Sequence, residues 1–166
     1  MFAIAKRENP ILDLRLGSGY NIPFKEKFDI VVASLVVHYL EDWNKMFKEV
    51  SRVLNNDGYF IFSTGNPVAE SKKCIEIDNI EIDVLDNYFE ERKIYGAWKD
   101  NNGKKMKMPS YHKTYETIIK TIIKNNFEIV NYKDCFPIPK AKKLFPEEYN
   151  EFSRVPLFTV WKVRKK

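Results

Sequence analysis

The sequence predicts an α/β domain, and three consecutive segments carry this prediction. Two nearly unbroken apolar runs, Phe28–Ser34 and Tyr59–Thr64, have the continuous hydrophobicity of strands that are buried on both faces. Between them, the apolar side chains of Asp42–Leu54 follow the i, i+3, i+4, i+7 spacing of an amphipathic helix. Strand, helix and strand within about 40 residues form a βαβ unit, which pairs its two strands in parallel.

Length and composition indicate one folded domain over residues 1–166. The chain has 166 residues, of which 44% are hydrophobic and 14% aromatic, enough to bury a core. This composition excludes a disordered or low-complexity protein.

Charge and apolar patterning narrow the expected partners and location. The 28 basic and 23 acidic side chains leave a net charge of +5, but four basic residues fall within the last five positions. We interpret this tail as a solubilising end, because a nucleic-acid interface would spread basic residues along one face. No apolar run approaches the roughly 20 residues of a membrane span, and no signal sequence is seen at the N-terminus. Cys74 and Cys135 lack metal or redox spacing, so free thiols in a reducing cytoplasm are expected.

The elements before the βαβ unit are short. Residues 1–9 are typical of the end of a helix before Pro10, and Ile11–Leu16 predicts a strand that stops at Gly17. A loop then follows over residues 21–27, and after the central helix Asn55–Gly58 favours a left-handed turn.

The second half alternates inserted and sheet-forming segments. Residues 71–109 predict an inserted cap segment over the sheet, with a hairpin between Lys93–Trp98 and Lys104–Met108 around an Asn101-Asn102-Gly103 turn. Further elements are expected as a helix at Thr114–Asn125, a strand at Phe127–Tyr132, a short helix near Glu147–Phe152 and a last strand at Val155–Val163.

Candidate ligand-binding residues gather where strands end, which is where α/β sheets bind ligands. Ser18–Tyr20, Ser34–His38 and Thr64–Pro67 all occupy such ends. Gly17-Ser18-Gly19 superficially resembles a nucleotide-binding turn, but no helix follows it, so a simple loop is the preferred interpretation. His38 is either a hydrogen-bonded loop histidine or a catalytic one. His112, beside Tyr111, either belongs to a polar patch over a pocket or begins a solvated helix. The two histidines and dispersed carboxylates show no metal-ligand spacing.

One block of the sequence, Phe28–Ser63, resembles the fourth strand, the next helix and the fifth strand of class I S-adenosylmethionine-dependent methyltransferases. Within it, Glu49 and Arg52-Val53-Leu54 match the helix of that family. Upstream, Gly17–Phe24 resembles the family's Gly-Asp-Ala-x-x-Leu-Pro-Phe. Downstream, Tyr111–Thr114 resembles the Tyr-His-Arg-Thr of its small-molecule, ubiquinone-biosynthesis-like members, and Arg154–Phe158 resembles its final strand.

The resemblance implies methyl transfer from S-adenosylmethionine to a small-molecule acceptor, with S-adenosylhomocysteine as product. By residue-to-residue correspondence, Ser18, Gly19 and Tyr20 would lie near the adenine, and Ser34, Leu35 and His38 near the methionine part of the cofactor. Tyr111 and His112 would face the acceptor, with His112 as a general base. Ser18 replaces the usual Asp, which weakens the adenine contact.

The resemblance also implies a Rossmann-like sheet that is truncated at its N-terminus. The family sheet has the order 3-2-1-4-5-7-6, and its glycine-rich loop and ribose-binding acid have no counterpart here, so the first two strands are expected to be missing. The apolar strand Phe28–Ser34 would then lie at an exposed edge. Two outcomes are expected: Ile11–Leu16 pairs with it, or two chains dimerise across it. The alternative function is therefore a non-catalytic methyltransferase-fold remnant that dimerises or binds a partner.

Overall fold

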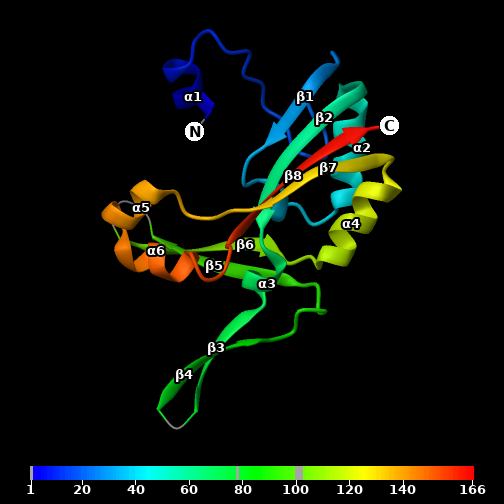
Figure 1. The fold of residues 1–166 in the computed structure, drawn as a ribbon. Helices are drawn as coiled ribbons and strands as arrows, with labels where there is room; N and C mark the ends of the chain where they lie inside the picture. Colours follow the sequence, from blue (N-terminus) through cyan, green and yellow to red (C-terminus); the bar gives the residue numbers. More distant parts are fainter. Residues whose placement is uncertain (1, 78, 100–102) are drawn as a thin grey trace.

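A four-stranded mixed sheet forms the centre of the chain in a computed structural model, which describes residues 2–77, 79–99 and 103–166 (Figure 1). The strand order is β1-β2-β8-β7. The first pair is parallel, and β8 runs antiparallel to both of its neighbours. The strands are β1 (Phe28–Ala33), β2 (Leu54–Gly65), β7 (Phe127–Asp134) and β8 (Phe158–Lys165). This arrangement confirms the α/β prediction and corresponds to positions 4-5-7-6 of the expected sheet.

Two amphipathic helices cover one face of this sheet. Helix α2 (Trp43–Val53) connects β1 to β2, and α4 (Tyr115–Lys124) precedes β7, on the same side of the sheet in Figure 1. Both helices begin with a side-chain cap: Asp42 accepts from the Lys45 amide at 2.9 Å, and Thr114 accepts from the Thr117 amide at 3.1 Å. Both predicted helices are therefore confirmed.

The end of α2 differs from the predicted turn. The helix stops at Val53, and Leu54 already belongs to β2. Residues 55–58 bulge out of the strand pair, since Phe28 is opposite Leu54 whereas Ile30 is opposite Tyr59. Within the bulge, Asp57 has a φ of 62°, so the left-handed position lies in the strand and does not cap the helix.

The core lies between the two helices and the sheet. Phe47 of α2 is fully buried, and its ring meets the rings of Phe60, Phe62 and Phe127 edge-on at centroid distances of 5.4–5.9 Å. Edge-on contacts of this kind add to the hydrophobic stabilisation of burial. The core thus joins α2 to β2 and β7 and fixes the position of the strand ends.

Strand β1 is buried on one face only. Val31 and Ala33 pack against the core, whereas Ile30 and Val32 are 55% and 66% exposed. Among the described residues, β1 pairs with β2 alone. The prediction of a strand at an exposed edge is confirmed, and the prediction of burial on both faces is wrong.

The segment before β1 does not become a strand. Helix α1 (Phe2–Glu8) is present as expected, but Ile11–Leu16 forms no strand in the described part of the chain, and Ile11 is 94% exposed. Arg15 instead donates to Asp13 at 2.7 Å and to the Pro23 carbonyl at 3.0 Å. These contacts fold the segment onto its own loop, so the expected pairing of Ile11–Leu16 with β1 is wrong.

The segment predicted as an insertion contains two hairpins, each a separate two-stranded sheet. The first, β3 (Lys72–Ile77) and β4 (Ile80–Leu85), projects away from the main sheet in Figure 1. The second, β5 (Lys93–Lys99) and β6 (Lys105–Tyr111), confirms the predicted hairpin, although Asn101 and Asn102 of its turn lie outside the described residues. Strand β6 contacts the short helix η1 (Val37–Tyr39) that follows β1. The two hairpins therefore lie at the carboxyl-terminal end of the sheet, whereas a layer over the face of the sheet was expected.

Three short helices complete the chain. Helix α3 (Pro67–Glu70) follows β2 directly, and α6 (Pro146–Phe152) confirms the helix predicted near that position. Helix α5 (Pro139–Leu144) was not predicted, and β8 begins three residues later than expected. No helix in the described ranges has the length and apolar character that crossing a membrane requires.

Candidate functional site

The chain turns sharply where β1 ends. Leu35 adopts a left-handed φ of 50°, and its amide donates to the Ser63 hydroxyl of β2 at 2.8 Å. A non-glycine residue in this region is strained, and such strain concentrates at ligand-binding positions. Its consequence here is that Ser34, Leu35 and Val36 are presented to the outside at the carboxyl-terminal end of the sheet.

The loop over residues 18–20 packs against the chain just after η1. The Tyr20 hydroxyl accepts a hydrogen bond from the Asp42 amide at 3.0 Å. Gly19 approaches Leu40 so closely that a Cβ atom would overlap the leucine side chain. The structure therefore places the predicted cofactor residues Gly19 and Tyr20 against Leu40 and Asp42, which follow the second predicted group, Ser34–His38, by two to four positions.

A charged pair on α2 holds this loop in place. Arg52 donates to the carbonyl oxygens of Ile22 and Phe24, both at 2.8 Å. Glu49 accepts from the Ile22 amide at 3.0 Å and pairs with Arg52 at 2.9 Å. Hydrogen bonds from Arg52 and Ile22 lower the pKa of Glu49. Glu49 and Arg52, which matched the methyltransferase helix in the sequence analysis, thus form hydrogen bonds with the backbone of this loop.

His38 is buried beneath the strand end. Burial lowers its pKa, and the nearby negative charge of Glu70 opposes that shift. Its Nδ1 atom has no hydrogen-bond partner among the described residues. A buried polar atom without a partner is unusual and is a candidate contact for a bound ligand or water.

His112 is 1% exposed, and both of its ring nitrogens contact acceptors. Nε2 lies 2.8 Å from the Tyr88 carbonyl oxygen, and Nδ1 lies 3.1 Å from a Glu70 carboxylate oxygen. Donation to a carbonyl and to a carboxylate requires a proton on each nitrogen. The hydrogen bond to Glu70 accordingly raises the pKa of His112. Because both ring nitrogens are already engaged by groups of this chain, the geometry favours positioning of β6 over general base catalysis.

Tyr111, the neighbour of His112, lines a polar pocket of about 440 Å³. Within its wall, Glu91 accepts from the Thr114 amide at 3.1 Å and pairs with Lys113 at 3.2 Å. Burial acts to raise the pKa of Glu91, but its hydrogen bonds outweigh burial and the pKa is lowered. The pocket is lined by Glu41, Glu91, Arg92, Lys93, Tyr111, His112 and Lys113. Because Glu41 lies two residues after η1, this pocket borders the segment that follows η1.

Glu70 is a site residue that the sequence analysis missed. Its carboxylate pairs with His112 and influences His38, so it connects the two histidines. The carboxylate occupies the space above Gly65, where any Cβ would overlap it. The sequence feature that could have indicated Glu70 is Gly65, a glycine at the end of a strand just before a short helix.

A hydrogen-bonded chain also connects the ends of β2 and β7. The Tyr132 hydroxyl donates to Asp134 at 2.6 Å and contacts the Tyr115 hydroxyl at 2.8 Å. Asn66 donates to the same Asp134 oxygen at 3.1 Å. Burial raises the pKa of Tyr115 and, together with the bond to Asp134, that of Tyr132. Both phenols therefore stay neutral and hold the strand ends together.

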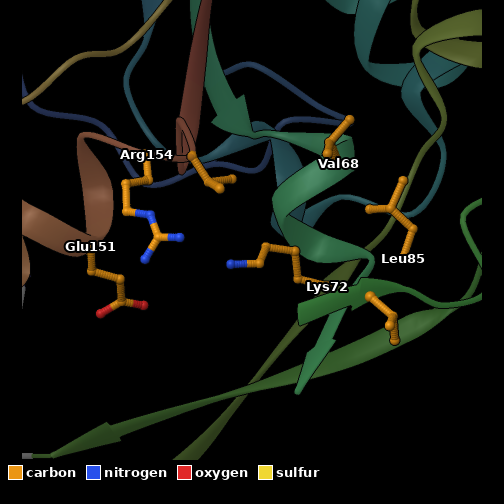
Figure 2. Close-up of a pocket in the computed structure, with 7 residues that line it drawn as sticks. Val68, Lys72, Leu85, Glu151 and Arg154 are labelled. Atoms are coloured by element: carbon orange, nitrogen blue, oxygen red, sulfur yellow. The ribbon is translucent and has the colours of Figure 1, made fainter. Parts of the chain in front are cut away.

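A second pocket of about 370 Å³ lies between α3, the first hairpin and the segment after α6 (Figure 2). Two basic residues, Lys72 and Arg154, and the acidic Glu151 stand among apolar side chains. It is lined by Val68, Lys72, Val84, Leu85, Glu151, Arg154 and Val155. The sequence analysis did not anticipate this pocket.

Comparison with known proteins finds a family-model match for the first part of the chain. Residues 1–62 match a family model described as "Methyltransferase domain". The first 62 residues are therefore similar to a methyltransferase domain. The strand order is the one expected for positions 4-5-7-6 of the methyltransferase sheet. The match ends within β2, so the later hairpins lie outside it, and of the residues that line the two described pockets only Glu41 lies inside it.

A solved structure shares the fold over the whole chain. The crystal structure of a putative S-adenosylmethionine-dependent methyltransferase from Listeria monocytogenes superimposes with a TM-score of 0.80 at 24% identity. The superposition covers 100% of this chain and 75% of the Listeria chain. The mixed sheet and its hairpins are therefore a methyltransferase fold.

Curated relatives match parts of their own length. An uncharacterised protein of Haemophilus influenzae is 26% identical over 161 residues, 89% of this chain and 61% of that protein. The ribosomal protein L11 methyltransferase of Staphylococcus haemolyticus is 39% identical over 61 residues, 36% of this chain and 18% of that enzyme. The chain thus spans less than two thirds of either relative.

The residues present fit S-adenosylmethionine in part. Ser34, Leu35 and Val36 offer an exposed surface at the strand end, and the buried Nδ1 of His38 lacks a partner in the described chain. The Ser18 hydroxyl and the Leu35 amide are already hydrogen-bonded within the chain. This chain's residues would therefore form one wall of a cofactor site.

Proposed function

We propose that the protein takes part in S-adenosylmethionine-dependent methyl transfer to a small-molecule acceptor. The observation that carries the proposal is the packing of Gly19 and Tyr20 against Leu40 and Asp42, beside the strained end of β1. Ligands of α/β sheets bind at such carboxyl-terminal strand ends. The similarity of residues 1–62 to a methyltransferase domain and the shared fold support the cofactor class. The likeness of Tyr111–Thr114 to small-molecule methyltransferases supports the type of acceptor.

In this proposal the chain's residues mainly position the two reactants. Ser18–Tyr20 would contact the adenine side of the cofactor, and Ser34, Leu35 and His38 its methionine side. Tyr111 would contact the acceptor from the wall of the polar pocket. His112 would hold Tyr111 in place through Glu70 and the Tyr88 carbonyl. Correct placement of donor and acceptor contributes much of the rate in a direct transfer.

Calorimetric titration of the purified chain with S-adenosylhomocysteine tests this function. Micromolar binding is expected, and Val36→Asp should weaken it at least tenfold because Val36 is half-exposed at the end of β1. Ile123→Asp is the matched control, since Ile123 is an exposed apolar residue of α4 outside the candidate site. Absence of binding at millimolar ligand would refute the proposed cofactor site in this chain.

A second candidate function is association through the edge of β1, with another chain or with a second copy. It is favoured by one observation: Ile30 and Val32 are exposed on a strand that pairs on one side only. Unpaired apolar edges are templates for strand pairing. Sedimentation velocity of the wild type and of Val32→Lys should show a larger species that the substitution abolishes. A monomeric wild type at high concentration would exclude self-association through this edge.

A further inference from the structure

Two hairpins stand outside the four-stranded sheet. Figure 1 shows β3 and β4 projecting away from the body of the chain, while β5 and β6 lie beyond the carboxyl-terminal end of the sheet. In the described part of the chain, each of these four strands pairs on one side only. A lone two-stranded hairpin is marginally stable in water, and an unpaired edge is a template for another strand. Both hairpins are therefore surfaces at which further strands can add.

The two hairpins carry opposite charge. Residues 74–85, which make up most of the first hairpin, include four acidic residues and no basic one, a charge of −4. Residues 93–111, the second hairpin, include five lysines and one aspartate, a charge of +4. Lys72 and Lys73 precede the acidic stretch at the base of β3, where Lys73 pairs with Asp86 at 3.8 Å. One chain thus presents an acidic and a basic hairpin whose charges are equal in size.

Apolar and charged positions alternate along β4 and β6. In β4, Ile80 and Ile82 are 62% and 39% exposed, and positions 81 and 83 are acidic. In β6, Met106 and Met108 are 44% and 37% exposed, and positions 105 and 107 are lysines. Successive residues of a strand point to opposite faces. Each of the two strands therefore has an exposed apolar face and a charged face, and only the sign of the charge differs.

One antiparallel register matches these two strands position by position. It begins with Ile80 of one copy of the chain opposite Met108 of a second copy. Ile82 then stands opposite Met106, and the acidic residues 81 and 83 stand opposite the lysines 107 and 105. Pro109, which cannot donate a hydrogen bond to a neighbouring strand, falls outside the paired stretch. Apolar pairs and opposite-charge pairs directly across two strands are both stabilising.

The same pattern determines which partner fits. Antiparallel pairing of β4 with β4 of a second copy opposes acidic residues, and pairing of β6 with β6 opposes lysines, so that like charges disfavour both arrangements. A second copy supplies a basic strand for β4 and an acidic strand for β6, and one two-fold axis satisfies both hairpins at once. We propose that two copies of this chain associate through their hairpins, with β4 of each copy paired to β6 of the other. This surface is separate from the edge of β1, and the proposal does not depend on methyl transfer.

A complementation experiment with the full chain tests this pairing. Glu81→Lys opposes two lysines in the dimer, and Lys107→Glu opposes two glutamates, so each variant should associate with itself about tenfold or more weaker than the wild type. A mixture of the two variants restores opposite charges in both halves of the dimer, because the reversed residue of one variant faces the reversed residue of the other. The mixed pair should therefore associate with nearly the wild-type dissociation constant.

Fluorescence-detected sedimentation velocity, with one member of each pair labelled, gives these dissociation constants. Lys142→Glu is the matched control, because it reverses an exposed lysine of α5 outside both hairpins and should associate like the wild type. Association through the edge of β1 is equal in all of these samples and cancels in the comparison.

A second pair of variants protects the test against misfolding. Asp83→Lys and Lys105→Glu should repeat the loss and its restoration at the neighbouring position of the register, and circular dichroism shows which variants are folded. A wild type that does not associate, single variants that associate like the wild type, or mixtures of folded variants no tighter than the single variants would each overturn the proposal.

Discussion

The buried pair of His112 and Glu70 makes a quantitative prediction about stability. His112→Gln replaces an imidazolium that donates to two acceptors by a neutral amide. The substituted side chain is 1% exposed, and that of Glu70 is 16% exposed. Removing one partner of a buried, hydrogen-bonded charge pair costs about 3–5 kcal/mol because the other charge is left without compensation. We expect a loss near the lower limit of that range, since Glu70 keeps some contact with solvent.

The size of the loss corresponds to a measurable change in melting temperature. In a domain of this length, 1 kcal/mol shifts the midpoint by about 2–4 °C, so about 3 kcal/mol lowers it by roughly 6–12 °C. Urea unfolding followed by circular dichroism gives the free energy directly. Lys107→Gln is the matched control, because Lys107 is an exposed residue of β6, the strand that ends directly before His112.

The pH dependence of this difference has a defined sign. The pKa of His112 is raised in the folded state by its bond to Glu70, above its ordinary value of 6.5. The stabilisation is therefore complete below about pH 6.5 and is lost as the pH rises through the folded-state pKa. The difference between the wild type and His112→Gln should be largest near pH 6 and should shrink toward pH 9. His38, whose pKa is lowered, contributes to both proteins and cancels in the comparison.

Two results would refute this reasoning. A loss below about 1 kcal/mol at pH 6 would mean that the pair is not buried and charged as described. A difference that stays constant or grows with pH would mean that His112 is neutral in the folded state.

Three further predictions concern the elements that position the site. Gly65→Ala should displace the Glu70 carboxylate from His112, because the added Cβ would overlap that carboxylate. A double-mutant cycle with His112→Gln should show that the two losses of stability are not additive. Additive losses would contradict this coupling. Phe47→Ala should lower the free energy of unfolding by about 3–5 kcal/mol, since Phe47 is fully buried among three other rings, while Ile123→Ala on the exposed side of α4 should change it by less than about 0.5 kcal/mol. Arg52→Ala should release the loop over residues 22–24 and speed tryptic cleavage at Lys25 and Lys27. Lys48→Ala on the same helix is the control. Equal cleavage rates in the two variants would show that the Arg52 hydrogen bonds do not hold the loop.

The local hydrophobic pattern was sufficient to predict an element of secondary structure wherever the partners of that element are close in the sequence. The strands β1 and β2 and the helix between them were predicted because their hydrophobic periodicity reports directly on burial in one contiguous unit. The caps Asp42 and Thr114 stand at the first positions of the two predicted helical segments, and each accepts from an amide three residues away. Ile11–Leu16 shows the limit of this signal. Its pattern is compatible with a strand, but a strand requires a hydrogen-bonding neighbour, and Arg15 binds the Pro23 carbonyl in place of one.

The candidate site separates into two parts on the same basis. Sequence pattern alone determined the βαβ unit and the strand ends where Ser34 and His38 lie, because these depend on residues a few positions apart. The exposed edge of β1 was expected from the family resemblance and not from the local pattern, which predicted burial on both faces. Tertiary structure decided the state of His112, whose partners Glu70 and Tyr88 lie 42 and 24 positions away. It also decided that Lys72 and Arg154 face one pocket. Protonation, charge pairing and pocket shape depend on which side chains are in tertiary contact, and hydrophobic periodicity carries no information about those contacts.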